Sequence, residues 1–329
     1  MGKGETMSII HIKNLCKTYK THKREPGVWN ALKSLFHREH KIIHALNNVS
    51  FDINKGEIVG FIGPNGAGKS TTIKAMSGIL YPTSGTVEAL GFTPWQDRVK
   101  FVQHIGVVFG QKTSLHWDLP AIDTYYLNKV LYEIPDKEFS QRLKRMAKIL
   151  DVEEVIKKPV RDLSLGERMK CEIISALLHN PSLVFLDEPT IGLDIVAKDR
   201  FREFILDINR TQGTTFIVTT HDMQDIERLC KRIIVINHGR IVYDGDIANV
   251  KAEFHCKHIE VKLNSKGMKF KLKGCNVIDQ SDFDIKLELN VKEAPVKKLI
   301  DHLVTEYDVA DIIVGDPPIE EIIQKVFKK

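Results

Sequence analysis

The strongest chemical signal in the sequence is a glycine-rich loop with the spacing GxxxxGK[ST] at residues 63–70. It directly follows an apolar run and opens a helical pattern, and its glycines let backbone N–H groups curl around phosphate oxygens. Lys69 would bring a positive charge to the β and γ phosphates, and Ser70 would place its hydroxyl on Mg²⁺. The loop therefore predicts a nucleoside triphosphate site. Its candidate binding residues are Gly63, Asn65, Gly66, Gly68, Lys69, Ser70 and Thr71.

A second signal is the apolar run 183–186, which ends in the adjacent carboxylates Asp187 and Glu188. At a strand end beside the phosphates, Asp187 would join Ser70 in the Mg²⁺ shell and Glu188 would face the attacking water. Without the glycine loop, an exposed acidic strand end would explain the pair equally well. With the loop present, the pair indicates Mg²⁺-dependent hydrolysis of the triphosphate.

These residues need a sheet to position them, and the pattern of the chain predicts one. Short β-rich runs come first, at 8–12, 49–53 and 58–62. Apolar strands then alternate with amphipathic helices as far as about residue 250, an order typical of a parallel α/β domain. The expected fold class is therefore α/β with a β-rich N-terminal subdomain.

Two further regions interrupt or follow this domain. Between residues 112 and 161 the pattern is mainly helical, with expected helices at 121–132 and 137–150, and we interpret it as a helical insertion. After an expected hairpin at 233–242, residues 251–329 have the order of a small α+β accessory domain. Its expected strands are 258–263, 269–272, 285–289 and 310–314, and its expected helices are 296–305 and 319–327.

The loop Leu163-Ser-Leu-Gly-Glu-Arg168 makes the chain resemble the ABC (ATP-binding cassette) family of P-loop NTPases, whose signature loop it matches. The other motifs of that family occur in the family's order. Gln111 resembles the Q-loop, Gly192-Leu-Asp194 the D-loop and His221 the H-loop. The resemblance covers roughly residues 8–250 and implies an ABC ATP-binding domain at 1–250.

The resemblance also implies how the site works. Two copies, or one copy and a close paralogue, would pair head to tail around two molecules of ATP, with Mg²⁺ as the metal. Glu188, His221 and Gln111 would be catalytic, and Gln111 would also sense Mg²⁺ and the γ-phosphate. Ser164 and Gly166 of the other copy would complete each site, and Glu167 and Asp194 are further candidate nucleotide-binding residues.

Two features depart from the family pattern. The signature reads LSLGE where LSGGQ is more frequent, so Leu165 replaces a glycine and Glu167 a neutral amide. The extra carboxylate would either weaken closure on the triphosphate or be neutralised by Arg168. For adenine stacking, Tyr19 resembles the family's aromatic position, but a segment at 20–44 follows it, and His44 is the alternative.

The inserted segment 20–44 carries a basic amphipathic pattern around Trp29 and Phe36. A helix that packs on its own domain and a helix that lies along a permease or the membrane interface both explain this pattern. Similar insertions occur in ABC subunits that export polysaccharides and in ABC-2 exporters. The tail resembles the small C-terminal domains of drug-export subunits, so we expect an ABC-2 type exporter subunit.

Composition limits the remaining possibilities. No run approaches the roughly 20 apolar residues that span a bilayer, and a signal-peptide apolar region is not seen, so any membrane role would be peripheral, through a permease on the cytoplasmic side. The net charge of +5 gives little support for a nucleic-acid partner. The five cysteines lack metal-ligand spacing. A soluble ABC ATPase in a non-transport machine, an exporter of a polysaccharide or lipid-linked glycan, and a nucleotide-gated scaffold remain the alternatives, and the sequence does not name a substrate.

Overall fold

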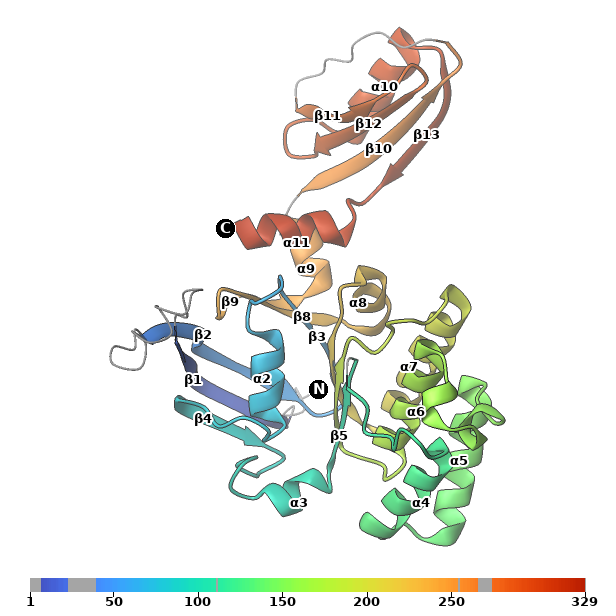
Figure 1. The fold of residues 1–329 in the computed structure, drawn as a ribbon. Coiled ribbons are helices and arrows are strands. Elements are labelled where there is room, and N and C mark those ends of the chain that lie inside the picture. The colour runs from blue at the N-terminus through green and yellow to red at the C-terminus, as the bar shows by residue number, and fades with distance from the viewer. Residues whose placement is uncertain (1–6, 23–39, 111, 254, 266–273, 329) are drawn as a thin grey trace, which may run out of the picture. The chain divides into compact units, whose positions relative to one another are not determined.

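The computed structural model describes residues 7–22, 40–110, 112–253, 255–265 and 274–328. The chain divides into two compact units, Met1–Asp244 and Gly245–Lys329 (Figure 1). Within the described residues, none of the helices has both the length and the apolar character needed to cross a membrane.

The centre of the first unit is a sheet with the strand order β5-β6-β7-β3-β8-β9. These strands are β3 (Ile58–Ile62), β5 (Ile105–Phe109), β6 (Leu183–Asp187), β7 (Thr215–Thr219), β8 (Arg232–Asn237) and β9 (Arg240–Asp246). β5, β6, β7, β3 and β8 pair in parallel. β3 and β7 are buried along their whole length, as expected of parallel strands covered on both faces. The carboxyl ends of β3, β6 and β7 therefore meet at one edge of the sheet.

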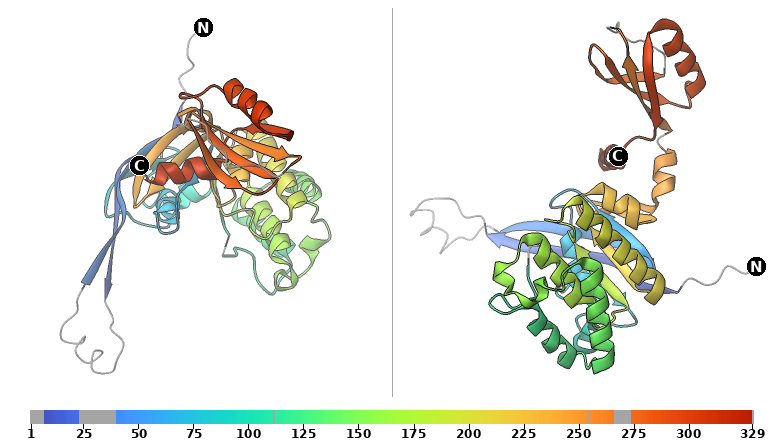
Figure 2. Two further views of the ribbon diagram at one scale, coloured as in Figure 1. Left: turned by 90° about the horizontal axis from the view of Figure 1, so that it is seen from above. Right: turned by 90° about the vertical axis from the view of Figure 1, so that its right-hand side faces the viewer.

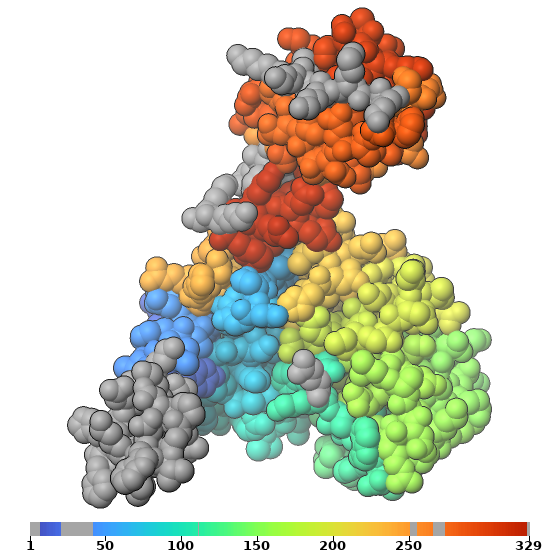
Figure 3. Space-filling model, turned by 45° about the horizontal axis from the view of Figure 1, so that its top comes forward, coloured from blue at the N-terminus to red at the C-terminus, as the bar shows by residue number. Residues whose placement is uncertain are grey.

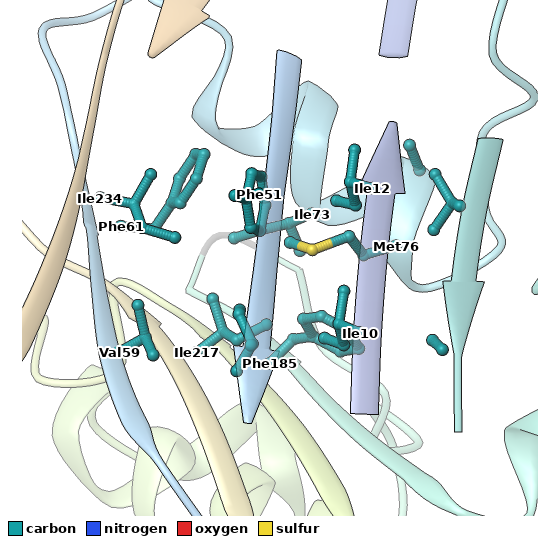
Figure 4. Close-up of a cluster of buried hydrophobic side chains, with 14 of the residues drawn as sticks. Ile10, Ile12, Phe51, Val59, Phe61, Ile73, Met76, Phe185, Ile217 and Ile234 are labelled. Atoms are coloured by element: carbon teal, nitrogen blue, oxygen red, sulfur yellow. The ribbon is translucent and has the colours of Figure 1, made fainter. Parts of the chain in front are cut away.

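A second, antiparallel sheet has the order β2-β1-β4. Its strands are β1 (Ser8–His22), β2 (His40–Asn54) and β4 (Ser84–Ala89). Figure 4 shows side chains of β1 and β2 meeting Phe61 of β3 and Ile73 of α2 (Lys69–Met76) in one buried cluster. This apolar layer holds the start of α2 in place between the two sheets, and it confirms the β-rich runs predicted near the N-terminus.

The hairpin of β1 and β2 includes both ends of the expected insertion at 20–44. Residues 20–22 and 40–44 belong to the two strands, with Lys20 opposite Ile42 and Tyr19 opposite Ile43. Figure 2 shows the two strands as a long blue hairpin. Each added pair continues the backbone hydrogen-bond ladder that begins in the buried half of the hairpin, so the strands extend beyond the predicted boundary. The predicted amphipathic helix around Trp29 and Phe36 lies outside the described residues.

The helices of the first unit follow the expected order. Besides α2 they are α3 (Arg98–Val102), α4 (Ala121–Leu131), α5 (Asp136–Leu150), η1 (Val155–Lys157), η2 (Val160–Asp162), α6 (Leu165–Leu177), α7 (Ile195–Gln212) and α8 (Met223–Leu229). α4 and α5 confirm the two helices predicted in the insertion. In Figure 3 the segment from α4 to α7 forms a continuous green to yellow surface of this unit.

The second unit is a four-stranded sheet with the order β11-β12-β10-β13, built within the described residues. Its elements are α9 (Ile247–Glu253), β10 (Cys256–Leu263), β11 (Cys275–Gln280), β12 (Asp284–Asn290), α10 (Val296–Glu306), β13 (Val309–Gly315) and α11 (Ile319–Lys328). Leu299 and Leu303 of α10 pack on the buried face of β10 and β12. Sequence patterning missed β11, because most of its side chains are exposed at a sheet edge. The strand predicted at 269–272 lies outside the described residues.

Candidate nucleotide site

A cleft of about 420 Å³ lies at the carboxyl edge of the parallel sheet. It brings together the glycine loop, the acid pair after β6 and the histidine after β7, as the motifs predicted. Its predicted lining residues are Asn65, Gly66, Gly68, Lys69, Ser70, Thr71, Asp187, Glu188 and His221. The sequence did not single out the other lining residues, which are Ala45, Pro64, Lys74, Ile79, Phe109, Gly110 and Lys112.

The glycine loop has a shape that other residues would not adopt. Gly68, the last residue before α2, has a φ of 114°, and a Cβ there would lie 2.8 Å from the carbonyl oxygen of Ala45. At position 63 packing alone requires glycine, since a Cβ would lie 2.3 Å from the carbonyl oxygen of Ile236. The close approach of β2 and β8 therefore determines the path of the loop and the direction in which α2 begins.

Lys69 directs its ammonium group along the inside of this loop. Nζ donates to the carbonyl oxygens of Gly63 and Pro64, the second at 3.2 Å, and only 8% of the residue is exposed. Burial lowers the pKa of Lys69, while the nearby carboxylates Glu188 and Asp187 act in the opposite direction. A buried, positively charged donor at the N-terminus of a helix is suited to phosphate oxygens.

Asp187 is held between two hydroxyl groups. Thr219 Oγ1 donates to Asp187 Oδ1 at 2.5 Å, and Ser70 Oγ donates to Oδ2 at 3.5 Å. Asp187 and Thr219 are direct partners in the β6–β7 register, and Thr219 is fully buried. Hydroxyl and carboxylate oxygens are ligands that Mg²⁺ prefers, so Ser70 and Asp187 fit that ion. Sequence reasoning missed Thr219, although its place two residues before His221 at the end of β7 was a usable signal.

Glu188 lies next to His221 at the opening of the cleft. His221 Nε2 is 3.3 Å from Glu188 Oε1, and the backbone N–H of His221 donates to Oε2 at 3.3 Å. Glu188 has a φ of 56°, and its own N–H donates to the carbonyl oxygen of Thr219. Burial raises the pKa of Glu188, and Asp187 raises it further, against the opposing effect of His221. A carboxylate with a raised pKa is a better proton acceptor, which suits a general base.

In the signature loop, Glu167 has a local partner in Ser164. Ser164 is the N-cap of α6, and the two residues form a capping box: Glu167 N–H donates to Ser164 Oγ at 3.2 Å, and Ser164 N–H donates to the Glu167 carboxylate at 2.9 Å. This backbone hydrogen bond lowers the pKa of Glu167. Arg168 lies over the ring of Trp117 at 5.8 Å and does not neutralise the carboxylate. The extra charge of the signature is therefore used locally, to stabilise the start of a helix.

The rest of the signature packs on the loop before α7. A Cβ on Gly166 would lie 2.6 Å from the carbonyl oxygen of Gly192, and Leu165 covers Gly192 from the other side. Asp194 is the N-cap of α7 and accepts from the N–H of Ala197 at 2.8 Å. In the described part of the chain, the lining of the cleft does not include the predicted binding residues Ser164, Gly166, Glu167 and Asp194.

The two candidates for adenine stacking lie on neighbouring strands. His44 pairs with Thr18, and Tyr19 pairs with Ile43, so Tyr19 and His44 project from opposite faces of the hairpin. Lys17 lies over the ring of Tyr19 at 5.3 Å. Among the described residues, the cleft is lined from this hairpin by Ala45 and by neither aromatic candidate. The predicted residue Gln111 lies outside the described residues, between Gly110 and Lys112.

Known proteins resemble this chain in sequence and in fold. A family model described as ABC transporter matches residues 46–191. The ABC transporter ATP-binding protein NatA of Bacillus subtilis is 34% identical over 215 residues, which cover 65% of this chain and 87% of NatA. The linearmycin resistance ATP-binding protein LnrL of the same organism is 34% identical, with 61% of this chain and 64% of LnrL covered. The methionine import ATP-binding protein MetN of B. subtilis is 31% identical, and the match covers 67% of this chain and 65% of MetN.

Among solved structures, the ATP-binding cassette MJ0796 has a similar fold. Its dimeric post-hydrolysis state bound to ADP and Pi aligns with a TM-score of 0.60 and 26% identity, covering 72% of this chain and 98% of that one. The likeness confirms the predicted P-loop NTPase fold of the first unit.

Proposed function

The chain belongs to the ABC transporter family of ATP-binding proteins, and from that premise we propose that it drives an ABC-2 type exporter through a separate membrane permease. As a member of this family it is an ATPase subunit that energises transport. The observation that carries the hydrolytic part of this proposal is the meeting of Glu188 and His221 beside Lys69 in one cleft. A scaffold that binds ATP without hydrolysing it has no need of a positioned base.

In the proposed mechanism, each group acts on one part of the triphosphate. Lys69 and the loop N–H groups bind the β and γ phosphates, Glu188 accepts a proton from the attacking water, and His221 orients Glu188 and the γ-phosphate. Ser70 and Asp187 would hold Mg²⁺, whose positive charge would offset the charge on the phosphates. Gln111 follows the cleft-lining Gly110 in the chain and would sense the γ-phosphate.

We also propose that the working unit is a homodimer, or a dimer with a close paralogue, that shares its sites. In support, Ser164 is exposed at the start of α6, and neither Ser164 nor the buried Gly166 lines the cleft of its own chain. The N-terminus of this capped helix would supply N–H groups to the γ-phosphate held by a second copy. MJ0796, which has the same fold, was solved as a dimer.

The permease partner would dock on the helical insertion. One face of α4 exposes four large apolar side chains, at Tyr126, Leu127, Val130 and Leu131, with exposed fractions between 44% and 73%. A patch of this kind is typical of a protein interface. The chain would then be peripheral on the cytoplasmic side of the membrane. The names of relatives include both resistance and import proteins. Export is proposed from the resistance proteins together with residues 251–329, the part of the second unit that we propose as an accessory domain.

The shared-site dimer is tested with Glu188→Gln. This variant should bind ATP like the wild type, hydrolyse it about 10²-fold to 10⁴-fold more slowly, and elute as a dimer in size-exclusion chromatography with Mg²⁺ and ATP. Lys69→Ala is the matched control, because it should lose ATP binding and remain a monomer. If Glu188→Gln hydrolysed ATP at the normal rate, or remained a monomer with ATP bound, the assigned roles would be wrong.

The transport partner is tested separately, by purifying Glu188→Gln with Mg²⁺ and ATP from gently solubilised native membranes. Recovery of a multi-spanning permease of the ABC-2 type is the expected result, and replacing Val130 and Leu131 with Ser should abolish it without loss of ATPase activity. Recovery of ribosomes or another soluble machine would favour the alternative, a soluble ABC ATPase.

A further inference from the structure

Glu172 is a buried carboxylate in the middle of α6 that takes no part in the chemistry described above. Only 5% of the residue is exposed. A carboxylate removed from water is strongly unfavourable unless hydrogen-bond donors replace the water that it loses. The identity of those donors therefore indicates what this side chain does.

The donors to Glu172 in the described structure come from three consecutive residues, Thr113, Ser114 and Leu115. Ser114 donates twice, from its N–H at 2.9 Å to Oε1 and from its hydroxyl at 2.5 Å to Oε2. The Thr113 hydroxyl donates to Oε1, and the N–H of Leu115 donates to the same oxygen at 3.4 Å. Both backbone and side-chain groups of one short segment are thus fixed on a single residue of α6.

This segment leaves the nucleotide cleft. Gly110 and Lys112, immediately before it, line the cleft, and Gly110 N–H donates to the carbonyl oxygen of Asp187 at 2.8 Å. The helix that bears Glu172 begins at the capped residue Ser164, eight residues earlier, which is about 12 Å along an α-helix. Glu172 therefore joins the wall of the cleft to the helix that carries the signature loop.

We propose that Glu172 is a positioning residue, whose carboxylate makes the segment 113–115 and α6 move as one body when the cleft binds ATP. The inference rests on the proposed shared-site dimer. A shift of the cleft wall on ATP binding would then be transmitted along α6 to Ser164 and Gly166, which face the second copy. Without the carboxylate, ATP would still bind to the glycine loop, but the signature end of α6 would not be aligned for closure.

Glu172→Gln tests this proposal, because the amide keeps the shape of the side chain but removes its negative charge and one of its two acceptor oxygens. Tyr125→Phe is the matched control. Tyr125 is also fully buried, and its hydroxyl donates to the carbonyl oxygen of Cys171 at 3.0 Å, so its loss removes a buried α4–α6 hydrogen bond without touching 113–115. Both variants should lower the melting temperature.

The two variants should differ in function. Glu172→Gln should bind a fluorescent ATP analogue within about twofold of the wild type, yet lower kcat at least tenfold and prevent ATP-dependent dimer formation in the Glu188→Gln background. Tyr125→Phe should retain both properties. Normal kcat and dimer formation in Glu172→Gln, or an equal loss in Tyr125→Phe, would overturn the proposal.

Ser114→Ala supplies a second route if Glu172→Gln does not fold. It removes one donor from the loop side, and it should lower kcat in the same direction with ATP affinity retained. Unchanged kcat in this variant would also overturn the proposal. The proposed dimer is checked independently by Glu188→Gln alone: if that protein does not dimerise with ATP, the proposed function fails, whereas normal dimers in every variant contradict only the role of Glu172.

Discussion

Thr219→Val examines how the cation site is built, because it removes one hydrogen bond and little else. Thr219 is fully buried, and its hydroxyl donates to Asp187 Oδ1 at 2.5 Å. Valine has nearly the same shape, so neither a cavity nor a clash results. After the substitution, the remaining hydroxyl on Asp187 is that of Ser70, at the longer distance of 3.5 Å.

The size of the effect follows from this geometry. A hydrogen bond to a charged group contributes about 1.5–3 kcal/mol, and in a unit of this size each kcal/mol lowers the melting temperature by about 2–4 °C. The expected loss is therefore about 3–12 °C. Because Thr219 orients a proposed Mg²⁺ ligand, its loss should also weaken the apparent affinity for Mg²⁺ by about 10-fold to 100-fold.

The assay is ATPase rate against free Mg²⁺ at saturating ATP, together with thermal unfolding followed by circular dichroism. Thr219→Ser is the control: it keeps the hydroxyl and loses a methyl group, so the melting temperature should fall while the Mg²⁺ dependence stays close to that of the wild type. If Thr219→Val showed the Mg²⁺ dependence of the wild type, the reasoning would be refuted, and either Asp187 would not bind the ion or Thr219 would not orient it.

Two further predictions concern the loops on either side of the cleft. Gly68→Ala should destabilise the fold by about 2–5 kcal/mol in urea unfolding, because left-handed backbone strain adds to a contact of 2.8 Å with the Ala45 carbonyl oxygen. Gly66→Ala is the control, since its Cβ would have open space, and it should cost about 1 kcal/mol. Equal losses of stability in the two variants would contradict the packing argument. The lowered pKa of Glu167 means that its carboxylate stabilises the fold above its ordinary pKa of 4.5, a contribution lost as pH falls through the lowered value. The difference in unfolding free energy between wild type and Glu167→Gln should thus disappear in acid, and a difference that persists to pH 2 would argue against the capping box.

The local parts of the site were predictable from sequence. The glycine loop and the acid pair each occupy consecutive residues, so their spacing specifies their geometry. The orienting role of Thr219 was not predictable in this way, because it depends on β6 and β7 becoming neighbours, and Asp187 and Thr219 are 32 residues apart. Likewise, the length of the β1–β2 hairpin depends on pairing between its strands. The helical pattern in the sequence between them gives no information about that pairing.

The capping role of Glu167 was readable in the sequence. Ser164 and Glu167 have the spacing of a capping box, S-x-x-E, at the start of a helical pattern. Glu172 had no such signal, because a single acidic residue in a helix is usually exposed, and only packing shows that it is buried.

These two glutamates make α6 the element on which the proposed shared site depends most. Glu167 stabilises the first turn, Leu165 packs over Gly192 where the family more often has a glycine, and Glu172 ties the middle of the helix to the cleft wall. A helix that is capped at one end and hydrogen-bonded to a loop in its middle transmits displacement rather than bending. The departures of this signature from the family pattern therefore add rigidity at the place where a second copy would bind the γ-phosphate, and Ser164 and Gly166, the residues that would contact it, are retained.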